Sequence, residues 1–198
     1  INAPVTVTIV FSEAVTGFTA TGINASNATV SNLQTADNIT YTATVTPVAD
    51  GGTSVSVPAG AATNIGGNDN TASNTLSFTF DGTAPVINQQ TFDIKGDSPA
   101  GTTVGKLSAT DAGGTLQNWA ITIDGSGGAL AIDGSGNITV KDAAILKSKA
   151  GTTVSVTVTV SDGLNTSAPA QVTINILSLF VNKAPTLDEI ADENNCDG

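Results

Sequence analysis

Apolar side chains occupy every second position in several stretches of the chain, mostly with threonine or serine between them. These stretches begin at Val5, Ile39, Val55, Leu76, Phe92, Trp119, Leu130, Ile138, Val154 and Val172. A period of two places alternate side chains on opposite faces of a β-strand, so each stretch predicts a strand with one buried face. Helical spacing is confined to residues 143–149, which would form one or two turns. The pattern therefore predicts an all-β protein.

Turn-forming residues separate these stretches at intervals of about 8–12 residues, a spacing typical of β-sandwiches. Residues 81–85, Asp-Gly-Thr-Ala-Pro, interrupt the pattern, and residues 182–185, Asn-Lys-Ala-Pro, repeat the interruption. Proline lacks an N–H donor and keeps the preceding residue extended, so both segments suit short, stiff joints. We expect one sandwich at residues 1–84 and a second at residues 85–181. Residues 182–198 would be a linker and the truncated start of a next module, with a strand at residues 186–192.

The buried faces of the predicted strands define two candidate cores. The first is expected to contain Val7, Ile9, Phe11, Tyr41, Leu76 and Phe78. The second is expected to contain Trp119, Ile121, Ile132, Ile138, Val156, Val158 and Ile174. Aromatic residues make up only 4% of the chain. Valine, isoleucine, leucine and alanine must therefore fill most of both interiors, which small β-branched side chains do well on a pleated surface.

The net charge of −11 is unevenly distributed along the chain. There is no arginine, and all the lysines lie between Lys95 and Lys183. Residues 1–84 contain no cation but carry Glu13, Asp37, Asp50, Asp69 and Asp81. Such a surface repels phosphate backbones and anionic lipids and attracts divalent cations. Nucleic-acid binding and membrane association are therefore not expected, and no run of about 18 apolar residues is present to span a bilayer.

The residue types that most catalytic sites need are missing. Without histidine the chain cannot form Ser-His-Asp or Cys-His nucleophiles or His-based zinc sites. A single cysteine, Cys196, can form neither a thiolate cluster nor an intrachain disulfide. A glycosidase needs two carboxylates, but the three glutamates are Glu13, Glu189 and Glu193, at opposite ends of the chain. We expect a non-catalytic protein, stabilised either by its cores alone or also by bound calcium.

Three sequence stretches in the first module point to a known family. They are residues 5–18, Val-Thr-Val-Thr-Ile-Val-Phe-Ser-Glu-Ala-Val-Thr-Gly-Phe, residues 41–47, Tyr-Thr-Ala-Thr-Val-Thr-Pro, and residues 59–63, Ala-Gly-Ala-Ala-Thr. On these stretches, residues 1–84 resemble the bacterial Ig-like repeats of very large adhesins. The resemblance implies an immunoglobulin-like sandwich in an extracellular protein.

The second module carries a different set of motifs. They are residues 99–102, Pro-Ala-Gly-Thr, residues 107–111, Leu-Ser-Ala-Thr-Asp, residues 130–138, Leu-Ala-Ile-Asp-Gly-Ser-Gly-Asn-Ile, and residues 156–163, Val-Thr-Val-Thr-Val-Ser-Asp-Gly. On these motifs, residues 86–181 resemble a cadherin-like domain, which implies a seven-stranded Greek-key sandwich. The expected fold class is therefore all-β, with two tandem immunoglobulin-like Greek-key β-sandwiches.

The cadherin-like resemblance also implies bound calcium between the modules. Asp111, Asn118 and Asp162 match ligand positions of that family and should gather at the end of the second module that faces the first. Asp81, in the joint, could reach the same place. Calcium takes about 6–8 oxygen ligands from carboxylates, amides, backbone carbonyls and water. These four residues are the predicted metal ligands.

The sequence departs from the cadherin-like pattern at calcium ligands. Gly96 stands where the family has a glutamate, and Gly113 stands where it has the second aspartate of an Asp-x-Asp motif. The second joint also lacks the acidic run that precedes the proline in that family. A site with fewer protein ligands would be single and rich in water. The alternative is that Asp111 and Asp162 only cap turns, as aspartates often do after a strand.

These observations predict a spacer and adhesion-stalk segment of a large secreted or cell-surface bacterial protein, stiffened by calcium. Its partners would be calcium ions, neighbouring repeat modules of the same chain, and a carbohydrate or another cell-surface ligand. The alternative is an accessory module of a secreted polysaccharide-degrading enzyme, serving as a spacer or binding carbohydrate weakly. Homophilic cell contact, as in animal cadherins, rests on analogy of fold alone. Flanking repeats would favour the stalk, and a flanking catalytic domain would favour the enzyme.

Overall fold

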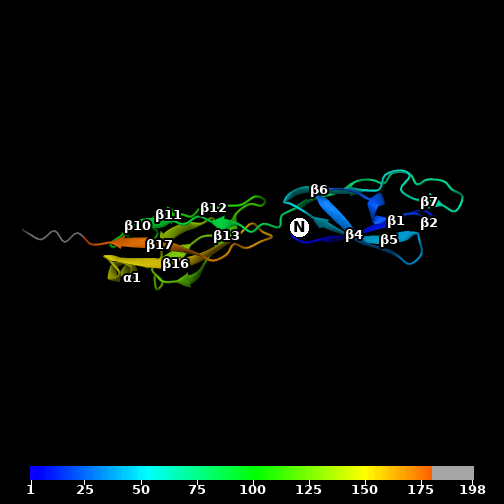
Figure 1. Ribbon diagram of the computed structural model, residues 1–198. Helices are drawn as coiled ribbons and strands as arrows, with labels where there is room; N and C mark the ends of the chain where they lie inside the picture. Colours follow the sequence, from blue (N-terminus) through cyan, green and yellow to red (C-terminus); the bar gives the residue numbers. More distant parts are fainter. Residues whose placement is uncertain (180–198) are drawn as a thin grey trace, which may run out of the picture.

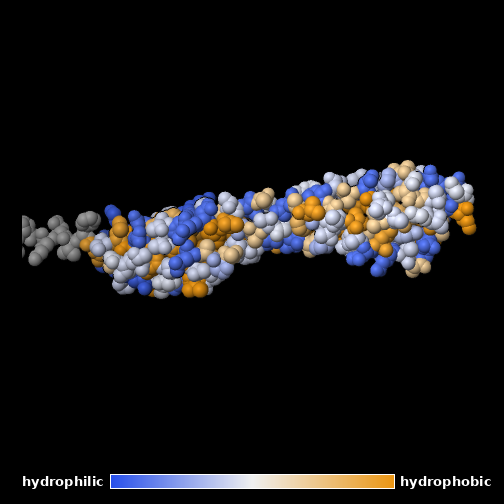
Figure 2. Space-filling view, in the orientation of Figure 1, coloured by the Kyte–Doolittle hydropathy of each residue, from blue (hydrophilic) through white to orange (hydrophobic). Residues whose placement is uncertain are grey.

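The computed structural model describes residues 1–179, which lie almost entirely in strands, turns and loops. They form two β-sandwiches that follow one another end to end (Figure 1). The space-filling view has the same elongated outline, with hydrophilic and hydrophobic residues interspersed along it (Figure 2). The predicted fold class, all-β with two tandem sandwiches of the immunoglobulin type, is confirmed. The linker and module start predicted at residues 182–198 lie outside the described residues.

Module 1, the sandwich within residues 1–80, is built from two small antiparallel sheets. Its elements are β1 (Val5–Val10), β2 (Val15–Thr16), the 3-10 helix η1 (Ala20–Gly22), β3 (Asn24–Ser26), β4 (Ala28–Thr35), β5 (Thr40–Pro47), β6 (Gly51–Ser56), β7 (Thr63–Asn64) and β8 (Leu76–Phe80). One sheet has the order β1-β5-β4 and the other the order β3-β6-β8, while β2 pairs with β7. Strands β1 and β8 are therefore edge strands.

Module 2, the sandwich that follows, has a larger sheet. Its elements are β9 (Val86–Ile87), β10 (Thr91–Lys95), β11 (Thr103–Lys106), β12 (Ala109–Thr110), β13 (Gln117–Asp124), β14 (Leu130–Ile132), β15 (Asn137–Val140), α1 (Ala143–Ser148), β16 (Thr152–Ser161) and β17 (Ala170–Leu177). One sheet has the order β10-β17-β16-β13 and the other the order β11-β15-β14, while β12 pairs with β9. The pairing of β10 with β17 is parallel, and the remaining pairings are antiparallel.

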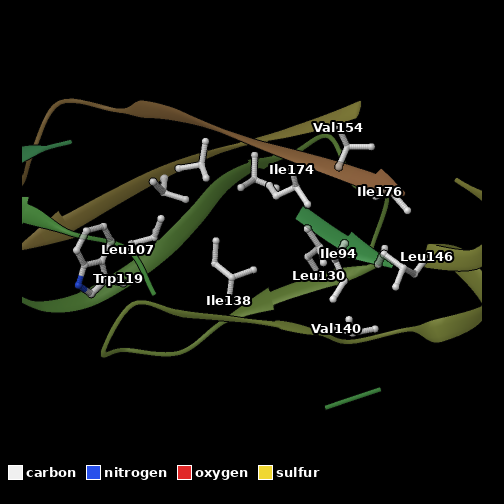
Figure 3. Packing of buried hydrophobic residues seen from close by; sticks show 14 of the residues in the cluster. Ile94, Leu107, Trp119, Leu130, Ile138, Val140, Leu146, Val154, Ile174 and Ile176 are labelled. Atoms are coloured by element: carbon white, nitrogen blue, oxygen red, sulfur yellow. The ribbon is translucent and has the colours of Figure 1, made fainter. Parts of the chain in front are cut away.

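Each module buries an apolar cluster of its own. The buried members in module 1 are Val7, Val15, Phe18, Ile23, Tyr41, Ala43, Val45, Val55, Val57 and Ala62. Those in module 2 are Ile94, Leu107, Trp119, Ala129, Leu130, Ile138, Val140, Leu146, Val154, Val156, Val158, Val160, Val172, Ile174 and Ile176. Figure 3 shows Trp119, Ile138 and Ile174 among the side chains that fill the second interior. Within residues 1–179, neither cluster includes a residue of the other module.

Most predicted core residues are buried, and one prediction is wrong. Val7, Tyr41, Trp119, Ile138, Val156, Val158 and Ile174 are buried, while Ile9, Phe11, Phe78, Ile121 and Ile132 are partly buried and pack against the clusters. Leu76 is 46% exposed. The reason is its place on β8, which is the outermost strand of its sheet and has no strand beside its outer edge among residues 1–179.

The predicted helical segment forms α1. Asp142 stands at its N-cap, where the side-chain oxygen accepts hydrogen bonds from the N–H groups of Ala144 and Ile145 at 2.8 and 3.0 Å. These bonds satisfy two donors that the first turn leaves free. Leu146 is buried in the core of module 2. Within residues 1–179, no helix has the length and the apolar run that a membrane crossing needs.

Replacing Val158 with aspartate should unfold module 2. Val158 is fully buried at the centre of β16, and an unpaired buried carboxylate costs several kcal/mol against a typical domain stability of roughly 5–15 kcal/mol. Trp119, the only tryptophan, lies in this core and reports its melting by fluorescence. The control is Ile123→Asp on the neighbouring strand β13, where the side chain is 67% exposed. Wild-type melting of the Val158→Asp variant would contradict the assignment of this core.

Candidate metal centre at the joint

Three carboxylates converge where module 1 meets module 2. One oxygen each from Asp81, Asp111 and Asp162 lies within 4.8 Å of the other two. Asp81 directly follows β8, Asp111 follows β12, and Asp162 follows β16, so three strand ends position them. Asp81 and Asp162 are only 4% and 6% exposed, and Asp111 is half-buried. The structure thus brings three of the four predicted ligands together, and their role in binding a metal stays a prediction.

Two glycines of module 2 leave space at the cluster, Gly113 beside Asp81 and Gly114 beside Asp162. A Cβ atom on Gly113 would collide with the carboxyl group of Asp81, and a Cβ atom on Gly114 would lie 2.6 Å from the carbonyl oxygen of Asp162. The N–H group of Gly114 donates to Oδ2 of Asp81 at 3.1 Å. Asp81 therefore fills the space beside Gly113, the position at which the cadherin-like pattern has an aspartate. The third carboxylate of the cluster thus comes from Asp81 in the joint, whereas Asp111 and Asp162 belong to module 2.

Asn165 ties the joint to module 2, and the sequence analysis did not find it. Its Nδ2 lies 3.0 Å from the backbone oxygen of Asp81 and 3.3 Å from that of Thr83, and it donates to both. It also donates to Oδ2 of Asp162 at 3.3 Å. The one available signal was its position three residues after Asp162, where an aspartate turn places the next polar side chain beside the carboxylate. In an asparagine-rich chain that signal is weak.

Module 1 adds its own contacts to the joint. Nδ2 of Asn2 donates to the carbonyl oxygen of Leu164 in module 2 at 2.9 Å. Oδ1 of Asp50, in the turn before β6, accepts a hydrogen bond from the N–H group of Gly82 at 2.6 Å. The N–H group of Asp81 donates to the carbonyl oxygen of Ile1 at 2.8 Å. The joint is thus bonded to module 1 at Asp81 and Gly82 and to module 2 at Asp81 and Thr83.

One oxygen in the cluster has no partner. Oδ1 of Asp111 accepts a hydrogen bond from the N–H group of Ala112 at 3.0 Å, whereas its Oδ2 is buried and accepts none from the described residues. A buried acceptor without a partner is costly, and native structures contain few of them. A single cation bonded at about 2.3–2.6 Å can be shared by oxygens up to roughly 5 Å apart. The three carboxylates, with this free oxygen, fit a hard divalent cation such as calcium.

Two carboxylates at the joint, those of Asp162 and Asp50, have a lowered pKa. Burial by itself would raise the pKa of Asp162, but the N–H groups of Asn165 and Leu164, both 2.6 Å from its Oδ1, outweigh burial and hold that pKa below its ordinary value. Hydrogen bonds from the Thr83 side chain and the Gly82 N–H group lower the pKa of Asp50, against repulsion from Asp162. The Asp162 side chain therefore stays ionised to a lower pH than an aspartate with an ordinary pKa.

Two other positions singled out by the sequence are not among the three clustered carboxylates. Asn118 is the second residue of β13, has a φ of +55° and exposes its side chain. Within residues 1–179, no hydrogen bond joins that side chain to the three aspartates. Gly96 follows β10 at the opposite end of module 2, where its N–H group donates to the carbonyl oxygen of Leu177 at 3.1 Å. A Cβ atom there would lie 2.5 Å from that of Ala150.

Family models match both sandwiches. Residues 1–80 match a model described as a bacterial Ig-like domain, and residues 81–175 match one described as a bacterial Ig domain. The chain belongs to the bacterial Ig-like families. Bacterial Ig-like domains are typically non-catalytic, serve in adhesion or as spacers, and are usually extracellular. A comparison with curated proteins found no match.

Solved structures similar to these Ig-like modules are cadherin domains. Mouse clustered PcdhgC3 EC1-3 is 17% identical, with a TM-score of 0.42 over 79% of this chain and 56% of that chain. The human desmocollin-1 ectodomain is 19% identical, with a TM-score of 0.43 over 71% and 29% of the two chains. The third cadherin domain of human protocadherin 7 is 22% identical, with a TM-score of 0.38 over 48% and 87%. The chain spans 41–58% of the length of the first three structures it matches. At these identities and TM-scores, we draw no conclusion about function from the structural similarity.

Replacing Asn165 with alanine should loosen the joint without unfolding either module. The change removes both amide donors, and each net hydrogen bond contributes about 0.5–1.5 kcal/mol, so we expect local opening to become easier by about 1–3 kcal/mol. Hydrogen exchange at Gly82 and Thr83, or proteolysis in the joint, measures this opening. The control is Thr166→Ala, next in sequence and exposed. Unchanged exchange in the Asn165→Ala variant would show that the amide does not hold the joint.

Acid should destabilise module 2 in part through Asp162. Its folded pKa lies below that of the unfolded chain, about 3.9, so its contribution is complete above that value and is lost as pH falls through the folded pKa. With a chelator present, the melting temperature reported by Trp119 should fall less between about pH 5 and pH 2.5 in Asp162→Ala than in wild type. The control Asp97→Ala, exposed at the far end of the module, should keep the wild-type slope. Equal slopes in all three proteins would contradict this role.

Proposed function

We propose that this chain is a spacer and adhesion-stalk segment of a large secreted or cell-surface bacterial protein, stiffened at its joint by calcium. The observation that carries the proposal is the joint itself, in which Asp81 leaves module 1 and is buried against module 2. A stalk keeps its length only if consecutive modules cannot fold back on one another. We place the module boundary near residue 84, the second module at residues 85–181, and the start of a further module within residues 182–198.

Short connections support the stalk function. Five residues separate the end of β8 from the start of β9. The last of them is Pro85, whose ring fixes its own φ and keeps the preceding residue extended. Hydrogen bonds from Gly114 and Asn165 hold Asp81, and Asn2 reaches across from module 1 to Leu164. Independent domains move relative to each other by default unless their interface prevents it. These bonds oppose that motion.

Calcium would be held by Asp81, Asp111 and Asp162, with Asn118 as a further predicted ligand. The fit rests on the donor set, which consists of hard oxygens, and on the free buried Oδ2 of Asp111. A bound cation would replace repulsion among three carboxylates by attraction to a common charge. Because Asp81 belongs to the joint and the other two aspartates to module 2, this attraction would fasten the joint to the module.

Calcium should raise the melting temperature of module 2 and narrow the range of shapes of the whole chain. With a dissociation constant in the range of about 0.1–1 mM, typical of extracellular modules, about 5 mM calcium stabilises the folded state by roughly 1–2 kcal/mol. Calorimetric titration measures binding, Trp119 fluorescence measures melting, and small-angle X-ray scattering measures the length distribution.

The matched variants for this experiment are Asp111→Ala and Asp97→Ala. Asp111→Ala removes the free carboxylate oxygen and should abolish the calcium-dependent shift, whereas Asp97→Ala, remote from the cluster, should keep it. If the wild-type protein neither binds calcium at millimolar concentration nor changes its melting temperature, the calcium part of the proposal is wrong. If scattering then also shows freely moving modules, the stalk function is wrong as well.

A further inference from the structure

The outer face of the β1-β5-β4 sheet carries neutral polar side chains. Along the central strand β5, threonines alternate with buried residues, so the threonine side chains point away from the core. Directly paired residues on antiparallel strands lie on the same face of a sheet. The threonines at positions 40, 42, 44 and 46 are thus flanked on β1 by Val10, Thr8 and Thr6 and on β4 by Gln34, Ser31 and Thr29. None of these residues is charged.

A bulge in the edge strand β4 brings Gln34 to this face. The pairing of β4 with β5 shifts register between Ser31 and Gln34, and Asn32 has a φ of +52°. Ser31 opposes Thr44 and Gln34 opposes Thr42, so both lie on the outer face although they are three residues apart. Without the bulge, strict alternation would place one of them on the buried face. The bulge therefore puts the amide of Gln34 beside Thr42.

A shallow hollow of about 350 Å³ lies next to Gln34, in the hairpin that joins β4 to β5. This volume is within the range of small-molecule sites. Strand β1 starts beside the joint and runs away from module 2, and its last residue, Val10, pairs with Thr40. The hairpin therefore lies at the end of module 1 that is remote from the joint (Figure 1). The lining residues are Gln34, Thr35, Ala36, Asp37, Thr40 and Thr42.

The hairpin loop fixes Asp37 and leaves one of its oxygens free. Oδ1 accepts hydrogen bonds from the N–H groups of Thr40 and Ile39 at 2.8 and 2.9 Å and from the hydroxyl group of Thr35 at 3.3 Å. The two backbone donors lower the pKa of Asp37, so its carboxylate stays ionised at neutral pH. Within residues 1–179, Oδ2 accepts no hydrogen bond. A fixed carboxylate with a free oxygen is a preorganised acceptor.

The other polar groups of the hollow are also free. The amide of Gln34 and the hydroxyl groups of Thr40 and Thr42 form no side-chain hydrogen bonds within residues 1–179. A carboxylate only accepts hydrogen bonds, whereas amides and hydroxyl groups both donate and accept. A ligand that satisfies them all presents several neighbouring groups that do both, as the hydroxyl groups of a sugar do. Val10, next to Thr40 and 67% exposed, adds an apolar surface for the C–H groups of a sugar ring.

We propose that this hollow binds a neutral sugar, with Asp37, Gln34 and Thr42 as its hydrogen-bonding partners. The inference goes beyond the stalk function, because it concerns module 1 alone and needs neither calcium nor the joint. Acidic sugars and phosphates are excluded, because residues 1–84 contain no cation to balance their charge beside Asp37. A peptide added as a strand is the less suitable ligand, because the bulge interrupts the edge of β4 that such a strand would extend.

Titration of the full chain followed by NMR tests the proposal. The probes are the methyl glycosides of glucose, galactose, mannose and N-acetylglucosamine. We expect the amide signals of Thr35, Asp37 and Thr42 to shift and saturate with at least one of them, with a dissociation constant of about 1–10 mM for so small a ligand. Glucuronate and glucosamine, anionic and cationic, are the charge controls. A chelator is present throughout, so that the outcome does not depend on calcium.

Two variants identify the residues that bind the sugar. Gln34→Ala removes a free amide, and Asp37→Asn keeps an oxygen for the N–H groups of the loop but replaces the free charged oxygen. Each should weaken binding at least about fivefold. The control is Gln171→Ala, an exposed glutamine of module 2, which should bind as tightly as wild type. An unchanged amide signal of the buried Val45 shows that module 1 of each variant is folded.

Three results would overturn the proposal. Absence of a saturating shift with all four neutral glycosides at about 50 mM would mean that the hollow binds no neutral sugar. Binding of glucosamine alone would mean that Asp37 only attracts cations. Wild-type affinity in both Gln34→Ala and Asp37→Asn would place the sugar elsewhere on the chain. Failure of calcium to bind at the joint would change none of these measurements.

Discussion

The burial of one carboxylate, that of Asp81, constrains both the sequence and the arrangement of the two modules. A buried polar group needs hydrogen-bond donors or a cation in place of the water it loses. Those donors, the N–H group of Gly114 and the amide of Asn165, belong to module 2, although Asp81 directly follows the last strand of module 1. The requirement explains why two glycines stand in succession at positions 113 and 114, since a side chain on either would occupy the space that the carboxylate and its neighbours need.

The fold could be predicted from alternation wherever a strand keeps a strict period of two. β5, β16 and β17 do so, because every second side chain enters a core. β4 escaped prediction because its pairing with β5 shifts register between Ser31 and Gln34, and Asn32 adopts a φ of +52°. Because of this irregularity, Val30 and Leu33 both pack against the core although they are three residues apart, so the apolar side chains of β4 do not follow a period of two. Leu76 was misassigned for another reason: alternation indicates which face a side chain takes but not whether a neighbouring strand covers it.

The candidate site was predictable only in part. Asp111 and Asp162 follow strands and match a family pattern, and Asp81 stands in a joint that any two-module chain must have. Asn165 could not be inferred, because its contact with Asp81 joins residues 84 positions apart, and no local pattern encodes such a distance. Gly113 was interpreted as the loss of a ligand. The structure gives it a second meaning, since the space beside it holds a carboxylate from the linker.

The parallel pairing of β10 with β17 has a mechanical consequence. The chain enters β10 from the joint side and leaves β17 at the far end of module 2, so tension along the long axis pulls the two strands in opposite directions along their common edge. Five residue pairs, from Thr91 with Thr173 to Lys95 with Leu177, share that load at once. When two paired strands are loaded in shear, their hydrogen bonds must break together, whereas the hydrogen bonds of a hairpin that is pulled open break one by one. Module 2 is thereby built to resist stretching more strongly than its modest size suggests.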